Sequence, residues 1–411
     1  MSLSEDKNVP ELRFKGFTDA WEQRKLDKLA TFSKGRGYSK SDLLSEGNPI
    51  ILYGRLYTKY ETVIEEVNTY AEKIEGSIIS HGDEVIVPAS GETSEDISRA
   101  SVVARSGIII GGDLNIINTN AEIDSVFLAL TISNGTQQKK LAKRAQGKSV
   151  VHIRNSDLKV VNLQYPNKEE QIKIGIFFKN IDNTIALHQE KLSKLQELKI
   201  AYSQVIFPLE GESIPRVRHT NFSENWEQRK LGEMAEIVRG ASPRPIKNPK
   251  WFDTESDVGW LRITDVTKQN GRIYQLEQRI SEEGQEKTRV LIEPHLLLSI
   301  AATVGKPVIN YIKTGVHDGF LIFLRPMFDK EFMFQWLETF RLKWQKYGQP
   351  GSQVNLNSEL VKNQETMIPT TEEQIKIGII FKQLDKTILL HKSKIDKLNN
   401  LKIAYLNKMF I

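Results

Sequence analysis

The sequence predicts an α+β protein in which two domains of mixed α/β structure are separated by two long, antiparallel coiled-coil helices, arranged as a pseudo-twofold tandem repeat. Three observations support this fold. Two separate segments of the chain of 411 residues recur in the same order. The longer recurring segment has the apolar spacing of a helix. The stretches between the recurring segments are similar in length but different in sequence.

The composition is that of a soluble, folded protein. Hydrophobic residues make up 39% and charged residues 27% of the chain, and the formal net charge is only +5. The chain has no cysteine, which excludes a disulfide scaffold, a thiolate metal site and a cysteine nucleophile. No window approaches the roughly 18 apolar residues of a membrane span, and the first residues lack the apolar core of a signal peptide, so a cytoplasmic protein is expected.

The repeat defines the organisation of the chain. The hexapeptide WEQRKL at 21–26 recurs letter for letter at 226–231, and a segment beginning EEQIKIG at 169–202 recurs at 372–405 with 23 of its 34 residues unchanged. Repeated catalytic domains would repeat their catalytic residues, whereas a repeated frame with different inserts suits two binding specificities. We expect a frame segment (1–30), a first variable domain (31–150), a central repeat with a long helix (151–213), a second frame segment (214–235), a second variable domain (236–353) and a distal repeat with the other long helix (354–411).

The long recurring segments are expected to be helices that pair with each other. Their apolar residues follow alternating steps of three and four with one slip, which is the narrow seam of a coiled coil. A helix of about 35 residues is roughly 50 Å long, and one so narrowly striped needs a partner. The seam positions are Phe178, Ile181, Ile185, His188, Leu192, Leu195, Leu198, Tyr202 and Ile206 in the first helix, and Phe381, Leu384, Ile388, His391, Ile395, Leu398, Leu401, Tyr405 and Met409 in the second.

Two histidines, His188 and His391, fall at equivalent seam positions. A metal site or a proton switch is one interpretation. We favour a polar seam residue that fixes the register of the helices, because no carboxylate is matched to these histidines in a ligand pattern. We therefore expect no metal in this chain.

Each variable domain should contain short strands broken by Gly and Asp turns. The strands are expected at 79–89, 102–112 and 114–119 in the first domain, and at 258–266, 296–310 and 319–326 in the second. Residues 330–347 have helical apolar spacing, and we expect Trp336 and Trp344 to lie in the core rather than to stack on bases.

A search for catalytic motifs finds only defective ones. Residues 146–149 resemble the end of a phosphate loop, but Ala142 stands where its first glycine is required. Residues 32–37 and 48–51 resemble the cofactor loop and the N-P-P-Y motif of adenine methyltransferases, yet the second proline and the aromatic ring are missing. A non-catalytic chain is therefore expected, with a self-sufficient adenine DNA methyltransferase or a coiled-coil scaffold that does not bind DNA as the alternatives.

Candidate binding residues lie in loops rich in Arg, Gly, Ser and Tyr, which can present guanidinium and hydroxyl groups to phosphate or bases. In the first variable domain they are Lys34, Arg36, Tyr38, Tyr53, Arg55, Tyr57, Ser90, Thr93, Lys148 and His152. In the second they are Arg239, Ser242, Arg244, Arg262, Thr264, Thr303, Lys306, Gln353 and Asn355.

The order of the repeats resembles that of the specificity subunit of type I restriction–modification systems. The motif P-x-x-E-E-Q at 166–171 and 369–374, the opening PELRF at 10–14, and the sequences GWLRITDV and SIAATVGKPVI in the second variable domain carry the resemblance. The second copy of the opening motif departs from this pattern, because PRVRH stands at 215–219.

The resemblance implies a non-catalytic subunit whose two target-recognition domains each read one half of a bipartite site in double-stranded DNA. It implies that the helices set the spacer and dock two modification subunits, which methylate adenine with S-adenosylmethionine. Restriction subunits that use ATP and magnesium would join that complex. Two different readers on a twofold frame should recognise an asymmetric site, since identical readers would demand a palindrome.

Overall fold

The computed structural model describes residues 9–145, 150–300, 303–347 and 356–411. These residues form two compact units. Unit 1 comprises Met1–Gln189 together with Lys392–Ile411, and unit 2 comprises Glu190–His391. Each unit therefore contains one variable domain, part of its own long helix and part of the other long helix.

The first variable domain is built on a five-stranded sheet. Its strands lie in the order β2 (Ala30–Lys34), β10 (Leu114–Thr119), β6 (Glu84–Pro88), β8 (Ser101–Val103) and β4 (Val63–Ile64), and only β8 and β4 are parallel. The central strand β6 is buried at every residue, as its run of apolar side chains demands. A smaller sheet joins β5 (Tyr70–Ala71), β3 (Asn48–Ile51) and β9 (Ile109–Ile110).

The second variable domain has the same strand order. Its five strands are β14 (Glu236–Arg239), β21 (Phe320–Leu324), β18 (Leu296–Ser299), β19 (Pro307–Asn310) and β16 (Arg272–Ile273), and again only the last pair is parallel. A three-stranded sheet of β15 (Gly259–Leu261), β20 (Thr314–Val316) and β17 (Arg289–Leu291) lies beside it. Two inserts with almost no sequence similarity thus share the topology of their five-stranded sheets.

The frame contributes a two-stranded ribbon to each unit. β1 (Glu22–Lys25) pairs with β12 (Asn162–Tyr165), and β13 (Glu227–Lys230) pairs with β22 (Glu365–Ile368), both antiparallel. The tryptophan before each first strand is buried, whereas the four strand residues EQRK are exposed. In the recurring hexapeptide, the tryptophan therefore anchors the ribbon and the next four residues supply backbone pairing.

Helices complete each unit. α3 (Ser125–Ser133) and α10 (Lys330–Phe340) follow the sheets, capped by Asp124 and Asp329. The other short elements of unit 1 are η1 (Leu26–Lys28), η2 (Lys40–Asp42), α1 (Arg55–Thr58), β7 (Ser90–Gly91), α2 (Ser94–Ile97), α4 (Gly135–Ala142), β11 (Val151–His152) and α5 (Asn155–Lys159). Those of unit 2 are α7 (Leu231–Met234), η3 (Pro249–Trp251), α8 (Ile263–Lys268), α9 (Glu282–Gln285), η4 (Arg341–Tyr347) and α11 (Ser358–Lys362).

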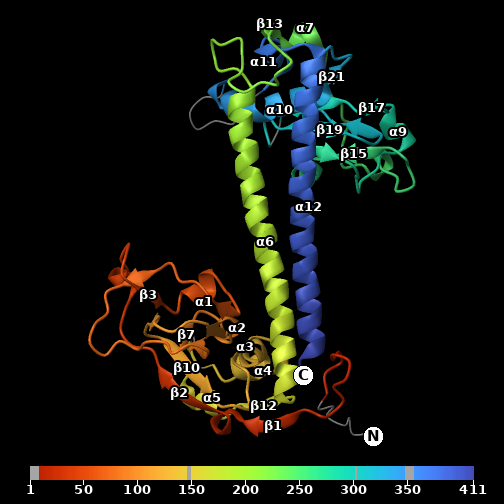
Figure 1. Cartoon of the computed structure of the whole chain (residues 1–411). Helices are drawn as coiled ribbons and strands as arrows, with labels where there is room; N and C mark the ends of the chain where they lie inside the picture. The colour runs from red at the N-terminus through yellow and green to blue at the C-terminus, as the bar shows by residue number, and fades with distance from the viewer. Residues whose placement is uncertain (1–8, 146–149, 301–302, 348–355) are drawn as a thin grey trace. The chain divides into compact units, whose positions relative to one another are not determined.

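The two long recurring segments are helices, as predicted. α6 (Lys168–Ile206) and α12 (Thr371–Met409) have 39 residues each and run side by side (Figure 1). In unit 1 the rings of Phe177 and Tyr405 lie 5.0 Å apart, and in unit 2 those of Tyr202 and Phe381 lie 5.7 Å apart. Within each unit, contacts made further along α6 involve residues that come earlier in α12, so the two helices pair in an antiparallel manner.

The seam differs from the expected one at its slip. Leu198 and Leu401 point outward with exposed fractions of 55% and 44%, and the next residues, Lys199 and Lys402, face the partner helix instead. Each lysine makes an ion pair of 2.5 Å, Lys199 with Asp385 in unit 2 and Lys402 with Asp182 in unit 1. The apolar stripe is interrupted at this position because a charged pair occupies it.

The remaining seam residues are buried or partly buried. Phe178, Ile181, Ile185, Ile206, Phe381, Ile388 and Met409 are buried, whereas His188, Leu192, Leu195, Tyr202, Leu384, His391, Ile395, Leu398 and Tyr405 are partly buried. Among the described residues, no three His, Asp or Glu side chains gather as a possible metal site.

Some expected strands are shorter or replaced. The segment 258–266 is a strand only at β15, and α8 begins at Ile263 because the Asp265 carboxylate accepts the Arg262 backbone N–H at the start of that helix. The segment 102–112 is split into β8 and β9, and 79–89 is a strand only from Glu84, after a turn at Gly82 and Asp83 with positive φ. The helix expected at 330–347 ends as α10 at Phe340 and continues as η4. Trp336 and Trp344 are buried in the core, as predicted.

Candidate nucleic-acid interface

An arginine–glutamate pair that recurs in both units joins each frame segment to the start of the long helix. Arg13 donates from Nε and Nη2 to the two carboxylate oxygens of Glu170 at 2.9 and 2.6 Å, and Arg218 donates to Glu373 at 2.8 and 2.7 Å. Both glutamate side chains are almost completely buried. A bidentate pair of this kind fixes direction as well as distance, so it orients the start of the helix against the opening frame segment.

The glutamine that follows this glutamate holds the capping residue of the neighbouring domain helix. The Gln171 side chain accepts the backbone N–H of Asp124 at 2.9 Å and donates to the carbonyl of Pro166 at 2.8 Å. In unit 2, Gln374 makes the same bonds, to Asp329 and to the carbonyl of its own preceding proline, at 2.8 Å each. The repeated E-E-Q motif is therefore a joint between the frame and the variable domain.

The glycine of the same motif allows the close approach. A Cβ atom on Gly378 would lie 2.7 Å from Asp329 Oδ1 and 3.0 Å from the Cβ of Glu331, and one on Gly175 would lie 3.3 Å from Val126. The motif lysines also repeat their contacts, since Lys173 and Lys376 lie 4.7 and 4.8 Å from the ring centroids of Phe17 and Phe222. The recurring residues thus form the contacts that hold each variable domain on its long helix, which we call its seat. They place no constraint on the loops of the domain.

Five candidate residues of the first variable domain lie together. Tyr57 donates from its hydroxyl to the carbonyl of Ser90 at 2.6 Å, and the ring of Tyr53 meets that of Tyr57 edge-on at 6.2 Å. His152 in β11 is the strand partner of Ser90 in β7, and Thr93 precedes α2 beside them. Burial raises the pKa of Tyr57, which keeps its hydroxyl protonated. Tyr53, Thr93 and His152 are exposed and form a surface with polar and aromatic groups.

The other candidates of the first domain fall into two groups. Lys34 and Arg36 are exposed near the end of β2. Tyr38 has a φ of 61° and donates to the carbonyl of Glu72 at 2.9 Å, and Arg55 pairs with Glu61 at 2.6 Å. Tyr38 and Arg55 therefore already hold the domain's own loops. Lys148 lies outside the described residues.

In the second variable domain, Asp318 gathers three candidates around one turn. Arg239 Nε donates to the Asp318 carbonyl at 2.6 Å, Ser242 Oγ donates to Oδ1 at 2.8 Å, and Arg244 Nη2 donates to Oδ2 at 2.6 Å. Burial acts to raise the pKa of Asp318, but the hydrogen bond from Ser242 and the charge of Arg244 hold it below its usual value. Arg244 remains 71% exposed, so its guanidinium is both oriented and accessible.

The remaining candidates of this domain lie elsewhere. Arg262 pairs with Asp265 and Glu277 at 3.0 and 3.3 Å, and Thr264 is exposed on α8. Lys306 is largely buried and pairs with Glu338 of α10, which gives it a role in the domain core. Thr303 is partly buried, while Gln353 and Asn355 lie outside the described residues.

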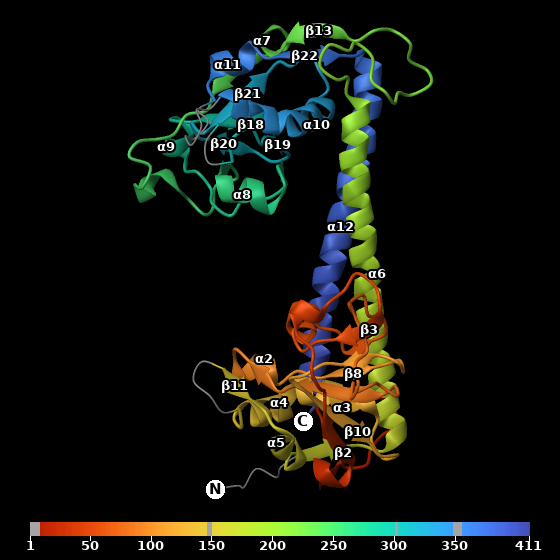
Figure 2. The ribbon, with the colours of Figure 1, turned by 90° about the vertical axis from the view of Figure 1, so that its left-hand side faces the viewer.

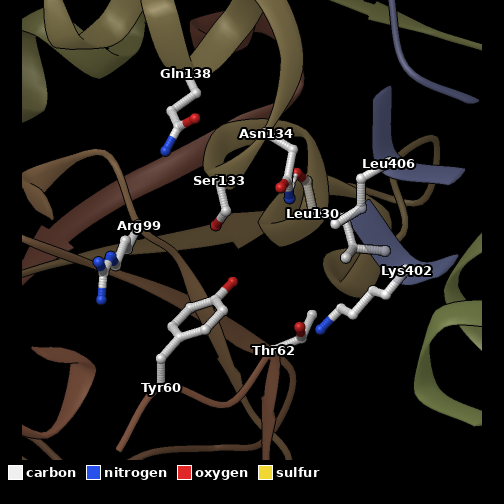
Figure 3. Close-up of a pocket in the computed structure, with 9 residues that line it drawn as sticks. All are labelled: Tyr60, Thr62, Arg99, Leu130, Ser133, Asn134, Gln138, Lys402 and Leu406. Carbon is white, nitrogen blue, oxygen red and sulfur yellow. Dashed lines mark hydrogen bonds between the residues drawn. The ribbon is translucent and has the colours of Figure 1, made fainter. Parts of the chain in front are cut away.

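A small polar cavity of about 90 Å³ lies where the first variable domain meets α12 in unit 1 (Figure 3). Tyr60, Arg99 and Lys402 face it, and burial raises the pKa of the tyrosine. Both cations are already neutralised, Arg99 by Asp96 at 2.7 Å and Lys402 by Asp182. The cavity is therefore a polar part of the domain's seat on the helices.

Sequence reasoning missed two features of these surfaces. Asp318 belongs to no recognisable sequence motif. Only the fold brings it close to Arg239, Ser242 and Arg244. The exposed cations at the end of α4 could have been found from charge alone, because residues 125–156 contain six Lys and Arg but no Asp or Glu.

The sequence profile of the family described as "Type I restriction modification DNA specificity domain" matches residues 18–197 and again residues 223–400. The chain belongs to this family. As a type I specificity subunit, it is the non-catalytic component that determines DNA specificity, and the alternatives of a self-sufficient methyltransferase and of a scaffold are not favoured. No helix in the described ranges is long and apolar enough to cross a membrane.

Relatives match this type I specificity subunit along its whole length. It is 20% identical over 430 aligned residues to the type I restriction enzyme MjaVIII specificity subunit of Methanocaldococcus jannaschii, covering 99% of this chain and 96% of that protein. The crystal structure of the type I restriction–modification S subunit from M. genitalium aligns with a TM-score of 0.65 at 16% identity, covering 98% and 99% of the two chains. A chain from a study of complex assembly and conformational transition of the type I R-M system aligns with a TM-score of 0.53 at 16% identity, covering 94% and 96%. The two structural similarities establish a shared fold.

Proposed function

We propose that the two variable domains, residues 31–150 and 236–353, are target-recognition domains that each read one half of an asymmetric bipartite site in double-stranded DNA. The observation that carries this proposal is that one strand order is used twice, on one repeated seat, with different exposed side chains. The first domain exposes Tyr53 and Thr93, next to the exposed His152 that follows it in β11, and the second exposes Arg244 on the turn held by Asp318. Different readers select different half-sites.

The proposed role of the long helices is to set the spacer between the half-sites and to dock two modification subunits. Ile172, Ile176 and Leu187 of α6 lie on the face opposite the seam, as the 3.6-residue period of a helix dictates. They are between 40% and 55% exposed. Their equivalents Ile375, Ile379 and Leu390 of α12 are between 43% and 61% exposed. An exposed apolar stripe that recurs residue for residue suits one kind of protein bound twice.

The cofactors of the complex are proposed to reside in its other subunits. A specificity subunit leaves methyl transfer to modification subunits with S-adenosylmethionine, and DNA cleavage to restriction subunits with ATP and magnesium. We propose a cytoplasmic complex with two modification subunits and, where a restriction partner is present, two restriction subunits.

Methylome sequencing of cells that carry this chain with its modification partner tests the proposal. Adenine methylation should appear at an asymmetric site made of two half-sites and an unread spacer. A palindromic or continuous site would contradict two independent readers. Methyl transfer by the purified chain alone, shown by mass spectrometry to be free of its partner, would instead support the alternative that the chain is a self-sufficient methyltransferase.

Paired substitutions test the docking stripe. Ile176→Glu should remove one modification subunit from the complex, and Ile176→Glu combined with Ile379→Glu should remove both, as measured by native mass spectrometry. Gln189→Glu, which adds the same charge on the helix flank, is the matched control and should leave the stoichiometry unchanged. Full occupancy in the double variant would contradict docking at this stripe.

A further inference from the structure

We propose that the basic side chains at the C-terminal end of α4, namely Lys139, Lys140, Lys143 and Arg144, bind the phosphate backbone of duplex DNA and so position the first variable domain on its half-site. This inference rests on the proposed function and deepens it, because it assigns a surface that holds the duplex without reading its bases.

The first support is the local excess of positive charge. The whole chain is nearly balanced, with 57 Lys and Arg against 52 Asp and Glu. Residues 125–156 contain six Lys and Arg and no acidic residue. A duplex carries one phosphate charge for about every 1.7 Å of its axis, so a cluster of cations without acids is the complement of its backbone.

The second support is the way α4 presents these charges. Gln137 and Leu141 are buried on the inner face of α4, and the side chain of Gln137 donates to the carbonyl of Asn162 at 2.8 Å. Lys139 and Lys140 lie on the outer face, followed by the C-cap residue Lys143. Because the inner face is fixed by burial, the cations cannot turn inward and are held toward solvent.

The third support is that these cations are not neutralised by the protein. Within the ranges that the structure describes, Lys139, Lys140, Lys143 and Arg144 are exposed and none takes part in an ion pair. Arg55 of the same domain, by contrast, pairs with Glu61 at 2.6 Å. A charge already paired with a carboxylate gains little from a phosphate, whereas an unpaired one releases counterions when DNA binds.

The fourth support is location. α4 packs beside α2, and α2 packs beside β7 and β11 (Figure 2). The helix that carries the exposed cations is therefore a close neighbour of α2, which Thr93 precedes, and of β11, which contains His152; these two are the polar candidates for base contacts. Phosphate contacts fix the register of a protein on DNA while base-edge contacts specify the sequence, and the two kinds of contact are adjacent in this arrangement.

In the second variable domain, the described lysines near the corresponding position contact other residues of the protein. The corresponding segment after α10 is η4, in which Lys343 lies 5.6 Å from the ring centroid of Phe340 and 4.0 Å from Glu210. Lys306 nearby pairs with Glu338. The basic surface on α4 lies in the first variable domain and is not part of the repeated frame.

The test measures DNA affinity over a salt series, using the full chain in complex with its modification partner and two duplexes, one with and one without the target site. The variant is Lys139→Gln with Lys140→Gln and Lys143→Gln. The matched control is Lys15→Gln with Lys25→Gln and Lys28→Gln, which removes three exposed frame lysines of the same unit. Glutamine keeps helix propensity, and the melting temperature of each protein reports on folding.

We expect the α4 variant to bind both duplexes more weakly and to lower the slope of log affinity against log salt by about two to three, since each phosphate contact contributes about 0.9. The methylated sequence should not change, and the control should keep the parent slope. An unchanged salt slope would overturn the inference. If the melting temperature of the variant fell while the slope stayed the same, the lysines would serve only to stabilise the end of the helix. An equal loss in the control, or a changed target sequence, would also overturn it. A parent complex without preference for the target duplex would instead contradict the proposed function.

Discussion

The frame and the variable domains differ in what repetition has preserved. The frame repeats its contacts atom for atom, since the buried pairs Arg13–Glu170 and Arg218–Glu373 are 2.6 and 2.7 Å long. The variable domains repeat only their strand order. A sheet needs apolar residues at alternate positions and accepts many sequences, whereas a bidentate ion pair needs two particular side chains. The molecule therefore fixes the seat by residue identity and leaves the loops free to differ in what they bind.

The two seats are not equally charged. In unit 2, Asp385 accepts from Lys199 at 2.5 Å, from Gln335 at 2.9 Å and from Arg272 of β16 at 3.0 Å. In unit 1, the equivalent Asp182 accepts from Lys402 at 2.5 Å and from Thr62 at 3.3 Å. At this aspartate, the second variable domain contributes an arginine and a glutamine, whereas the first variable domain contributes the hydroxyl of Thr62.

The largest expected effect is on the joint. Glu373→Ala leaves Arg218 buried without its carboxylate and should lower the free energy of unfolding of unit 2 by about 3–5 kcal/mol. Glu372→Ala, the exposed neighbour in the same motif, removes only an i,i+4 pair with Lys376 and should cost about 0.5 kcal/mol. Native-state hydrogen exchange of the backbone of unit 2 measures both. Equal costs for the two variants would mean that the joint is not what seats the domain.

The next effect sharpens the difference between the seats. Asp385→Asn weakens the bonds to both Arg272 and Lys199, whereas Asp182→Asn weakens the bond to one lysine. We expect a cost of about 2–4 kcal/mol for the first and about half of that for the second, because more buried charge is left uncompensated. Hydrogen exchange of each unit in its own variant gives the two costs. A larger cost for Asp182→Asn would reverse the comparison.

The charged seat also predicts acid sensitivity of unit 2. Burial acts to raise the pKa of Asp385, but Lys199 and Arg272 hold it below its usual value, and Arg272 and Tyr311 do the same for Glu331. Carboxylates with lowered pKa stabilise the fold above their unfolded values of about 3.9 and 4.3, and this contribution is lost as the pH falls through the folded values. Hydrogen exchange of unit 2 at about pH 5 and about pH 3.5 should therefore show a loss of stability that is smaller in Asp385→Asn. An identical loss of stability in variant and parent would mean that Asp385 does not contribute to the acid sensitivity of unit 2.

The smallest effect on stability is expected in the loops. Arg244→Ala should change the free energy of unfolding by less than about 0.5 kcal/mol, because the side chain is largely exposed. It should nevertheless weaken binding to the half-site that the second variable domain reads, and therefore reduce methylation. The loss of binding free energy should be about 1–3 kcal/mol if the guanidinium contacts a guanine. Arg325→Ala, an exposed arginine of the same domain, is the control. A uniform loss over all sequences would place Arg244 on phosphate.

The sequence predicted the frame better than the interface. The repeat and the apolar spacing predicted both long helices, since letters repeated in order report repeated structure. Lys199 and Lys402 were not predicted as seam residues, because their carboxylate partners lie on the other helix, far away in sequence. Asp318 was missed for the same reason, since strand pairing brings it to Arg239. Local spacing can predict an element, but a contact between distant segments needs the fold.

Exchanging residues 31–150 for the corresponding domain of another family member tests the central claim most directly. Methylome sequencing of the chimera beside the parent should show one changed half-site, with the other half unchanged. The reason is that the second variable domain keeps its own sheet, its own seat on Gln374 and its own loop around Asp318. A change in both half-sites would mean that the two domains do not read DNA independently, and it would contradict the account.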